Sequence, residues 1–175
     1  MNQRVTYCLC WGLLGLHGVK HRFCKSRPVE IISAVRRRGL IAAIAPNGRI
    51  YVAGQDQSFT GEDIVWFLNK LCGRYRKRDL LIIWDGASIH RSEAVKAFLK
   101  ERPGRVHLES LPPYSPELNP VELVWSQLKN RLKNRVFLSL QDLMQAVQEQ
   151  LNIFERERKL VQAFFHKKEI GFFTG

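Results

Sequence analysis

A chain of 175 residues has the length of a single domain, and two independently folding domains are not expected at this size. Hydrophobic residues make up 45% of the sequence, which is enough for a buried core and excludes a wholly disordered chain. Lysine and arginine number 28 against 16 acidic residues, so the net charge of +12 favours a polyanionic partner. A membrane span needs about 20 apolar residues in a row, and Tyr7–Gly18 is too short and too interrupted, so we expect no membrane partner.

The first 29 residues form an irregular basic segment. They hold five Lys or Arg and no Asp or Glu, and they keep neither a strand period nor a helix period. We therefore predict that residues 1–29 lie outside the native core and that residues 30–175 form the folded domain. All four cysteines lie at or before Cys72, so more than half of the chain could not be crosslinked by a disulfide. This is not the distribution of a disulfide framework, and a reducing cytoplasm is the expected location.

The predicted domain begins with a β-hairpin and a helix. Apolar runs at Leu40–Ala45 and Arg49–Ala53 flank Asn47-Gly48, and Asn-Gly between apolar runs is a strong hairpin signal. The segment Thr60–Asp63 then has the pattern of a capping box, and it predicts a helix that continues to about Gly73.

The second half of the chain predicts two strands and three helices. Leu80–Trp84 is a continuous apolar run, typical of a central strand covered on both faces, and Val106–Leu111 predicts a second strand. A helix capped by Ser92 lies between them. Asn119 and the residues after it have the signature of a helix start, and a last helix is expected over Ser139–Phe154. The order of elements indicates a mixed α/β sheet with helices on its faces.

Two carboxylates occupy positions where such sheets place ligands. Asp85 follows a strand at its carboxyl end, and Glu122 lies in the first turn of a helix. Two carboxylates that converge in a basic protein suit Mg²⁺ or Mn²⁺ and indicate phosphodiester cleavage or transfer. The local alternatives remain open at this stage: Asp85 can start a turn, and Glu122 can cap its own helix.

Two motifs give a resemblance to a known family. Residues 84–90 read Trp-Asp-Gly-Ala-Ser-Ile-His, and residues 111–122 read Leu-Pro-Pro-Tyr-Ser-Pro-Glu-Leu-Asn-Pro-Val-Glu, followed by Trp125 and Lys129. From about Ala34 to Phe165 the chain resembles the DDE endonuclease domain of bacterial insertion-sequence transposases of the mariner superfamily. The second motif is specific to that family, and it disfavours a ribonuclease-H-like nuclease unrelated to transposition.

The resemblance implies a ribonuclease-H-like fold in which a metal-bound acidic triad cuts DNA and joins the freed 3′-hydroxyl to target DNA. It makes Asp85 the second acid and Glu122, rather than Glu117, the third, with Mg²⁺ or Mn²⁺ as the cofactor. The implied partners are transposon-end and target DNA, together with a second copy or a full-length transposase. His90 matches the histidine of the family signature, and we interpret it as a packing residue that does not touch DNA.

The first acid of the family has no counterpart. It belongs on the first strand of the sheet, upstream of Leu40–Ala45, whereas Glu30 and Asp56 occur in unlike contexts. The helix-turn-helix segments of these transposases are also missing. We therefore expect an N-terminally truncated catalytic domain that lacks its first strand and is inactive alone. The alternative is a catalytically inactive DNA-binding remnant, or a regulator of an intact transposase.

Three basic runs are candidates for phosphate contacts, while charge runs are commonly no more than solvated faces. They are Arg36–Arg38, Arg74–Arg78 and Lys129–Arg135. The net charge favours DNA contact by some of them, and the sequence does not say which.

Overall fold

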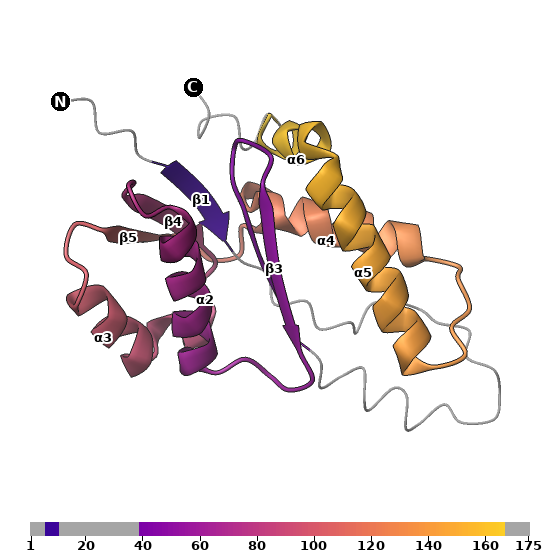
Figure 1. The fold of residues 1–175 in the computed structure, drawn as a ribbon, viewed down its shortest axis with the longest axis horizontal. Coiled ribbons are helices and arrows are strands. Elements are labelled where there is room, and N and C mark those ends of the chain that lie inside the picture. Colours follow the sequence, from indigo (N-terminus) through magenta and orange to yellow (C-terminus); the bar gives the residue numbers. More distant parts are fainter. Residues whose placement is uncertain (1–5, 11–38, 167–175) are drawn as a thin grey trace.

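The computed structural model describes residues 6–10 and 39–166 (Figure 1). The strands of the described residues are β1 (Thr6–Cys10), β2 (Gly39–Ile44), β3 (Ile50–Gln55), β4 (Leu80–Trp84) and β5 (Val106–Ser110). Their α-helices are α2 (Gly61–Arg74), α3 (Glu93–Lys100), α4 (Pro120–Leu132), α5 (Leu140–Arg156) and α6 (Arg158–Phe165). Short 3₁₀ turns cover Ser88–Arg91 and Pro116–Leu118.

The strands form one mixed sheet in the order β3-β2-β1-β4-β5. The hairpin strands β2 and β3 are antiparallel, β1 is antiparallel to β2, and β1, β4 and β5 run parallel to one another. In Figure 1, α2 and α3 lie on one side of the sheet and α4, α5 and α6 on the other. The predicted mixed α/β class with flanking helices is confirmed.

The prediction that the first strand is missing was wrong. Strand β1 lies at the centre of the sheet, where Leu9 pairs with Ile44 of β2 on one side and with Ile83 of β4 on the other. This strand is defined by its two neighbours, and five residues without a clear period carry no local signal for such pairing. Residues 1–5 and 11–38 lie outside the described part of the chain, so the boundary between residues 29 and 30 stays a prediction.

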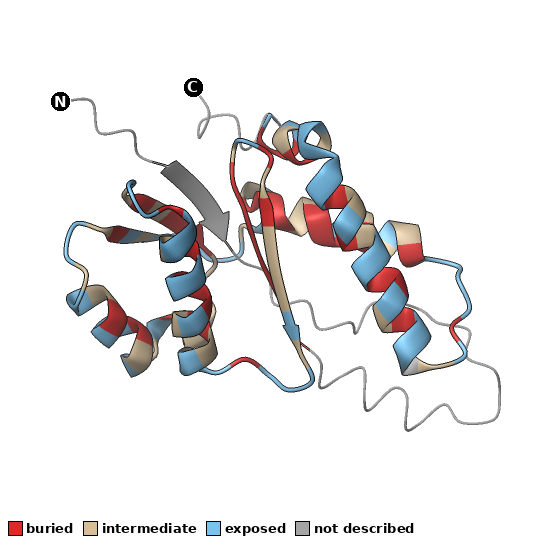
Figure 2. Ribbon diagram, in the orientation of Figure 1, coloured by how far each residue is buried: buried red, intermediate tan, exposed pale blue. Residues whose placement is uncertain are grey.

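Side chains alternate along the strands, so the apolar residues are divided between a core on each face of the sheet. Leu40, Ala42, Ile44 and Ile83 face the core shared with α4, α5 and α6. Their neighbours in sequence, Ile41, Ala43, Ile82 and Trp84, face the core shared with α2 and α3. Buried residues accordingly run along the sheet and along the inner faces of the helices (Figure 2). The central strands are therefore covered on both faces, as their continuous apolar sequence predicts.

Most helix boundaries follow the capping signals. Thr60 and Ser139 each begin a helix with a capping box, in which the third helical residue is Asp63 or Asp142. The short helix α6 was not predicted. It starts at Arg158 without a side-chain cap, and Glu157 alone separates it from the end of α5. Within the described part of the chain, no helix is both long and apolar enough to cross a bilayer.

The hairpin turn predicts a stability effect. Gly48 has a φ of +78°, and a Cβ atom at this position would collide with the carbonyl oxygen of Arg158 at the start of α6. Gly48→Ala should therefore lower the free energy of unfolding by at least about 2 kcal/mol in urea titrations. Alanine is strained at this positive φ, and its Cβ would push the turn away from Arg158. Gly73→Ala is the control, since its Cβ would meet nothing within 4 Å and alanine favours the helix. Equal losses for both variants would contradict this account of the turn.

Candidate functional site

The candidate site lies where β4 and β5 end at the same edge of the sheet. Trp84 pairs with Ser110 at the ends of the two parallel strands. Leu111, the first residue after β5, donates its N–H to the carbonyl oxygen of Trp84 at 2.7 Å. The loop that leads to α4 therefore leaves the sheet directly beside Asp85.

Asp85 is the first residue beyond β4. Ile83 faces the core of α4, Trp84 faces the core of α2, and the strand ends at Trp84. Its Oδ1 accepts a hydrogen bond from the N–H of Ala87 at 3.1 Å, so the turn role considered from the sequence is realised. The side chain stays 39% exposed, which leaves carboxylate surface open to a ligand.

His90 holds the Asp85 segment in place. The His90 ring is buried and stacks on Trp84, with ring centroids 4.3 Å apart and planes 7° from parallel. Its Nδ1 lies 3.1 Å from the backbone oxygen of Asp85 and 3.2 Å from Oδ1 of the same residue. Both partners accept hydrogen bonds, so Nδ1 must carry the proton. This geometry agrees with a packing and positioning role for His90.

Glu122 is presented by the first turn of α4. Asn119 is the buried N-cap, and its side chain accepts a hydrogen bond from the N–H of Val121. The N–H of Asn119 itself donates to the carbonyl oxygen of Pro116 at 3.0 Å. A capping box would need that same N–H for the Glu122 carboxylate. The carbonyl oxygen of Pro116 therefore takes the hydrogen bond that a capping Glu122 would accept. The Glu122 carboxylate remains available to a ligand.

The negative charge of Asp85 acts on the Glu122 carboxylate. The pKa of Glu122 is raised above its ordinary value, first because burial penalises the charged form and also because of the negative charge of Asp85. Lys129 acts in the opposite direction and lowers the pKa. A divalent cation would relieve both the burial penalty and the repulsion.

Hard carboxylate oxygens fit Mg²⁺ or Mn²⁺, so the residues present suit the metal that the family resemblance implies. Asp85 and Glu122 alone are an incomplete set of metal ligands. Among the described residues, no group of three or more acidic, histidine or cysteine side chains is placed to hold a metal ion. The five residues of β1, Thr6–Cys10, include no acid.

Two residues near this end of the strands were part of the sequence motif, but the motif assigned them no role at the carboxylates. Lys129 lies seven positions after Glu122, about two helical turns, and that spacing places it on the same face of α4. Tyr114 is fully exposed on the proline-rich loop with a φ of 59°, which is uncommon for a residue other than glycine. The three prolines of the loop were a signal for stiffness, and nothing local predicted this conformation.

The basic runs differ in how far their cations are engaged. In the run Lys129–Arg135, Arg131 pairs with Glu157 at 3.6 Å and lies over the Phe154 ring. Arg135 lies over Phe137 in the same way. Arg76 and Lys77, in the run Arg74–Arg78, are exposed. The run Arg36–Arg38 lies outside the described residues. Arg131 therefore contributes to the packing of α4, whereas Lys133 and Arg135 are exposed.

Comparison with known proteins gives consistent matches. A family model described as a DDE superfamily endonuclease matches residues 25–144, more than half of the chain. An uncharacterized protein of Sinorhizobium fredii, y4pE/y4sA, is 40% identical over 65 residues, which are 37% of this chain and 44% of that protein. The chain thus spans less than half of this curated relative.

Solved structures of Mos1 mariner transposase share the fold. The Mos1 catalytic domain matches with a TM-score of 0.60 and 14% identity, covering 97% of this chain and 81% of that one. A Mos1 paired-end complex with the left transposon end gives a TM-score of 0.57 and 15% identity, covering 97% and 55%. A paired-end complex with Mn gives the same TM-score and identity, covering 96% and 55%. The ribonuclease-H-like arrangement expected from the sequence is confirmed.

Proposed function

Because this chain belongs to the DDE superfamily endonucleases, we propose that it is the DNA-cleavage and strand-transfer domain of a transposase. The observation that supports the proposal is that Asp85 lies near enough to Glu122 for its charge to raise the Glu122 pKa. Asp85 follows β4, and Glu122 lies in the first turn of the helix that comes after β5, the strand parallel to β4. Open α/β sheets bind ligands at the carboxyl ends of their strands. The proposed cofactor is Mg²⁺ or Mn²⁺, and the proposed partners are transposon-end and target DNA and a second copy or full-length transposase.

Each residue of the site has a task in this proposal. Asp85 and Glu122 hold the cation, which when bound neutralises phosphate charge and activates the attacking oxygen. His90 fixes the orientation of Asp85 through its Nδ1–H, and Lys129 favours the ionised form of Glu122. The Mos1 transposase complexes with transposon-end DNA and with Mn support the choice of partner and metal by analogy.

A second candidate is a catalytically inactive DNA-binding remnant or a regulator of an intact transposase. One observation favours it: β1 contributes no acid to the sheet, and the described residues supply two carboxylates where the family uses three. Both candidates keep DNA as the partner, so cleavage assays separate them. The cytoplasmic location expected from the cysteines stays a prediction.

The metal site is tested first by protein stability. Because the pKa of Glu122 is raised in the folded protein, its contribution to stability is fully present below the unfolded pKa of about 4.3 and is lost as pH rises through the folded pKa. Glu122→Gln should therefore raise the thermal midpoint by a few degrees near pH 7 and leave it unchanged near pH 4. Mn²⁺ should raise the midpoint of the wild-type chain at neutral pH and raise that of the Glu122→Gln variant less.

Glu117→Gln is the matched control, because Glu117 is an exposed acid in the short turn that precedes α4. It should behave like the wild-type chain in both pH and Mn²⁺ series. An equal response of the Glu117 and Glu122 variants to Mn²⁺ would exclude Glu122 as a metal ligand.

A further inference from the structure

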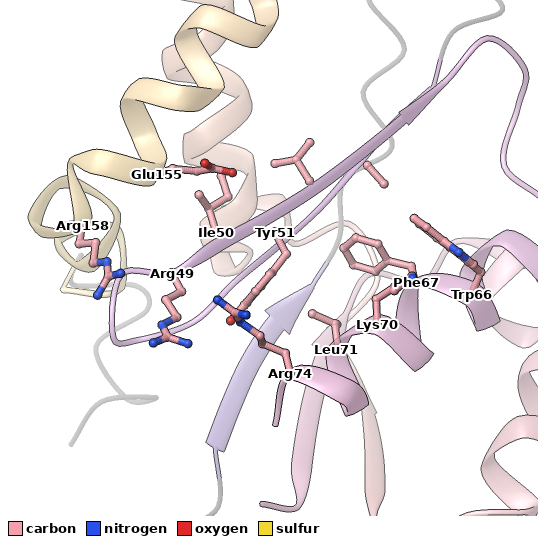
Figure 3. A pocket seen from close by; sticks show the side chains of 12 residues that line it. Arg49, Ile50, Tyr51, Trp66, Phe67, Lys70, Leu71, Arg74, Glu155 and Arg158 are labelled. Atoms are coloured by element: carbon pink, nitrogen blue, oxygen red, sulfur yellow. The ribbon is translucent and has the colours of Figure 1, made fainter. Parts of the chain in front are cut away.

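A groove of about 520 Å³ lies at the edge of the sheet formed by β3. Side chains from β3, from α2 and from the junction of α5 and α6 line it, as Figure 3 shows. We call it the sheet-edge groove. Strands β2 and β1 lie between β3 and β4, the strand that Asp85 follows, and neither Asp85 nor Glu122 lines the groove.

The charge of the groove is positive. Its lining includes four cationic side chains and one acidic side chain, Glu155, which leaves three net positive charges. The cationic residues are Arg49, Lys70, Arg74 and Arg158. A concave site with this charge selects an anionic ligand.

The arginine end of the groove is held in place by surrounding contacts. The guanidinium of Arg49 is hydrogen-bonded to Tyr51, and the Tyr51 hydroxyl donates to the Tyr75 hydroxyl at 3.0 Å. The turn residue Gly48 packs against the carbonyl oxygen of Arg158, which brings the hairpin turn next to α6. Arg49 and Arg158 therefore converge from distant parts of the sequence (Figure 3).

The other end of the groove presents an aromatic ring. Trp66 is 51% exposed, although the neighbouring Phe67 is buried in the core of α2. The ammonium group of Lys70 lies 5.6 Å from the Trp66 ring centroid. Figure 3 shows Trp66 at the end of the groove away from Arg49 and Arg158. An exposed indole beside cationic groups is the arrangement on which unpaired bases stack.

We propose that the sheet-edge groove binds an unpaired nucleotide of a DNA strand, with its base against Trp66 and its phosphates against Arg49 and Arg74. The volume lies within the usual range for small-ligand sites, which suits one nucleotide. Bases inside a duplex have both faces covered by their neighbours, so stacking on Trp66 favours an unpaired base. The inference rests on the proposed function for DNA as the partner and does not involve the carboxylates.

The test is binding of a labelled 12-nucleotide oligo-dT, measured by fluorescence anisotropy in EDTA, with a 12-base-pair duplex for comparison. Trp66→Ala should weaken oligo-dT binding roughly fivefold to a hundredfold and affect duplex binding much less. The Arg49→Gln/Arg74→Gln variant should reduce the slope of log affinity against log salt by about 1.4, the value for two phosphate contacts on a single strand. Lys70→Gln provides a second, exposed variant at the aromatic end.

The matched control is Lys96→Gln/Lys100→Gln, which removes the same charge from exposed positions of α3. It should keep the wild-type salt slope for oligo-dT. Groove variants that bind oligo-dT like this control would overturn the inference, as would an equal effect of Trp66→Ala on duplex and single strand. Loss of oligo-dT binding in Asp85→Ala would assign the strand to the carboxylate site instead. None of these outcomes affects the Mn²⁺ response of Glu122, so the two proposals fail separately.

Discussion

Cleavage of supercoiled plasmid by this chain is expected to be at the limit of detection in Mg²⁺ or Mn²⁺, and one added carboxylate is expected to install it. Magnesium gives up its hydration shell reluctantly, so two carboxylates hold a pair of ions poorly. Leu9 on β1 pairs with Ile83, two residues before Asp85, and Ile83 packs on the face of α4. Leu9→Asp therefore introduces an acid at the β1 position that pairs with Ile83, two residues before Asp85.

The expected gain in plasmid nicking for Leu9→Asp is more than about 100-fold, since even residues outside the metal's first ligand shell contribute 10- to 100-fold in such sites. Leu9→Asn is the matched control without charge and should remain inactive. Asp85→Ala or Glu122→Ala in the Leu9→Asp background should abolish the gain, with circular dichroism to verify folding. Robust cleavage by the unmodified chain that survives Glu122→Ala would show that the acids or the mechanism are wrong.

Duplex DNA binding is expected to fall steeply with salt. The formal charge of +12 favours phosphate contacts, and each one contributes about −0.9 to the slope of log affinity against log salt. About five contacts would lower the affinity about 500-fold between 50 and 200 mM salt. Electrophoretic mobility or anisotropy measurements across this range test the expectation. Affinity that does not change with salt would point to a different partner.

The structure also indicates which basic run contributes to this slope. Arg76 and Lys77 are exposed, whereas Arg131 is engaged by Glu157 and Phe154. Arg76→Gln/Lys77→Gln should therefore reduce the salt slope, and Arg131→Gln should reduce stability more than DNA binding. The reverse pattern would assign the phosphate contacts to α4.

Local chemistry explains why so much of the fold was predictable. The Asn47-Gly48 turn, the Thr60 capping box and the Asn119-Pro120 helix start each encode their element within a few residues, and the structure has all three. The positions of Asp85 and Glu122 at the sheet edge follow from the same boundaries. The charge of Asp85 reaches Glu122 because β4 and β5 pair in parallel. The apolar runs of the sequence indicate this pairing only in general terms.

The features that were missed depend on distant parts of the chain. Strand β1 exists through its pairing with β2 and β4, and α6 begins without a capping side chain. The sheet-edge groove gathers Arg49, Trp66 and Arg158 from three elements, and no spacing along the sequence connects them. Tertiary pairing and packing of this kind leave no local signal.

The most direct test of the central claim is a crystal structure of the chain with Mn²⁺, read by anomalous diffraction. The account predicts an anomalous peak coordinated by carboxylate oxygens of both Asp85 and Glu122, with the two carboxyl groups less than about 8 Å apart, as a shared metal site requires. Glu122→Gln crystals grown in the same conditions should show a weaker peak or none. A manganese peak elsewhere, or carboxylates directed to opposite faces of the sheet, would contradict the assignment.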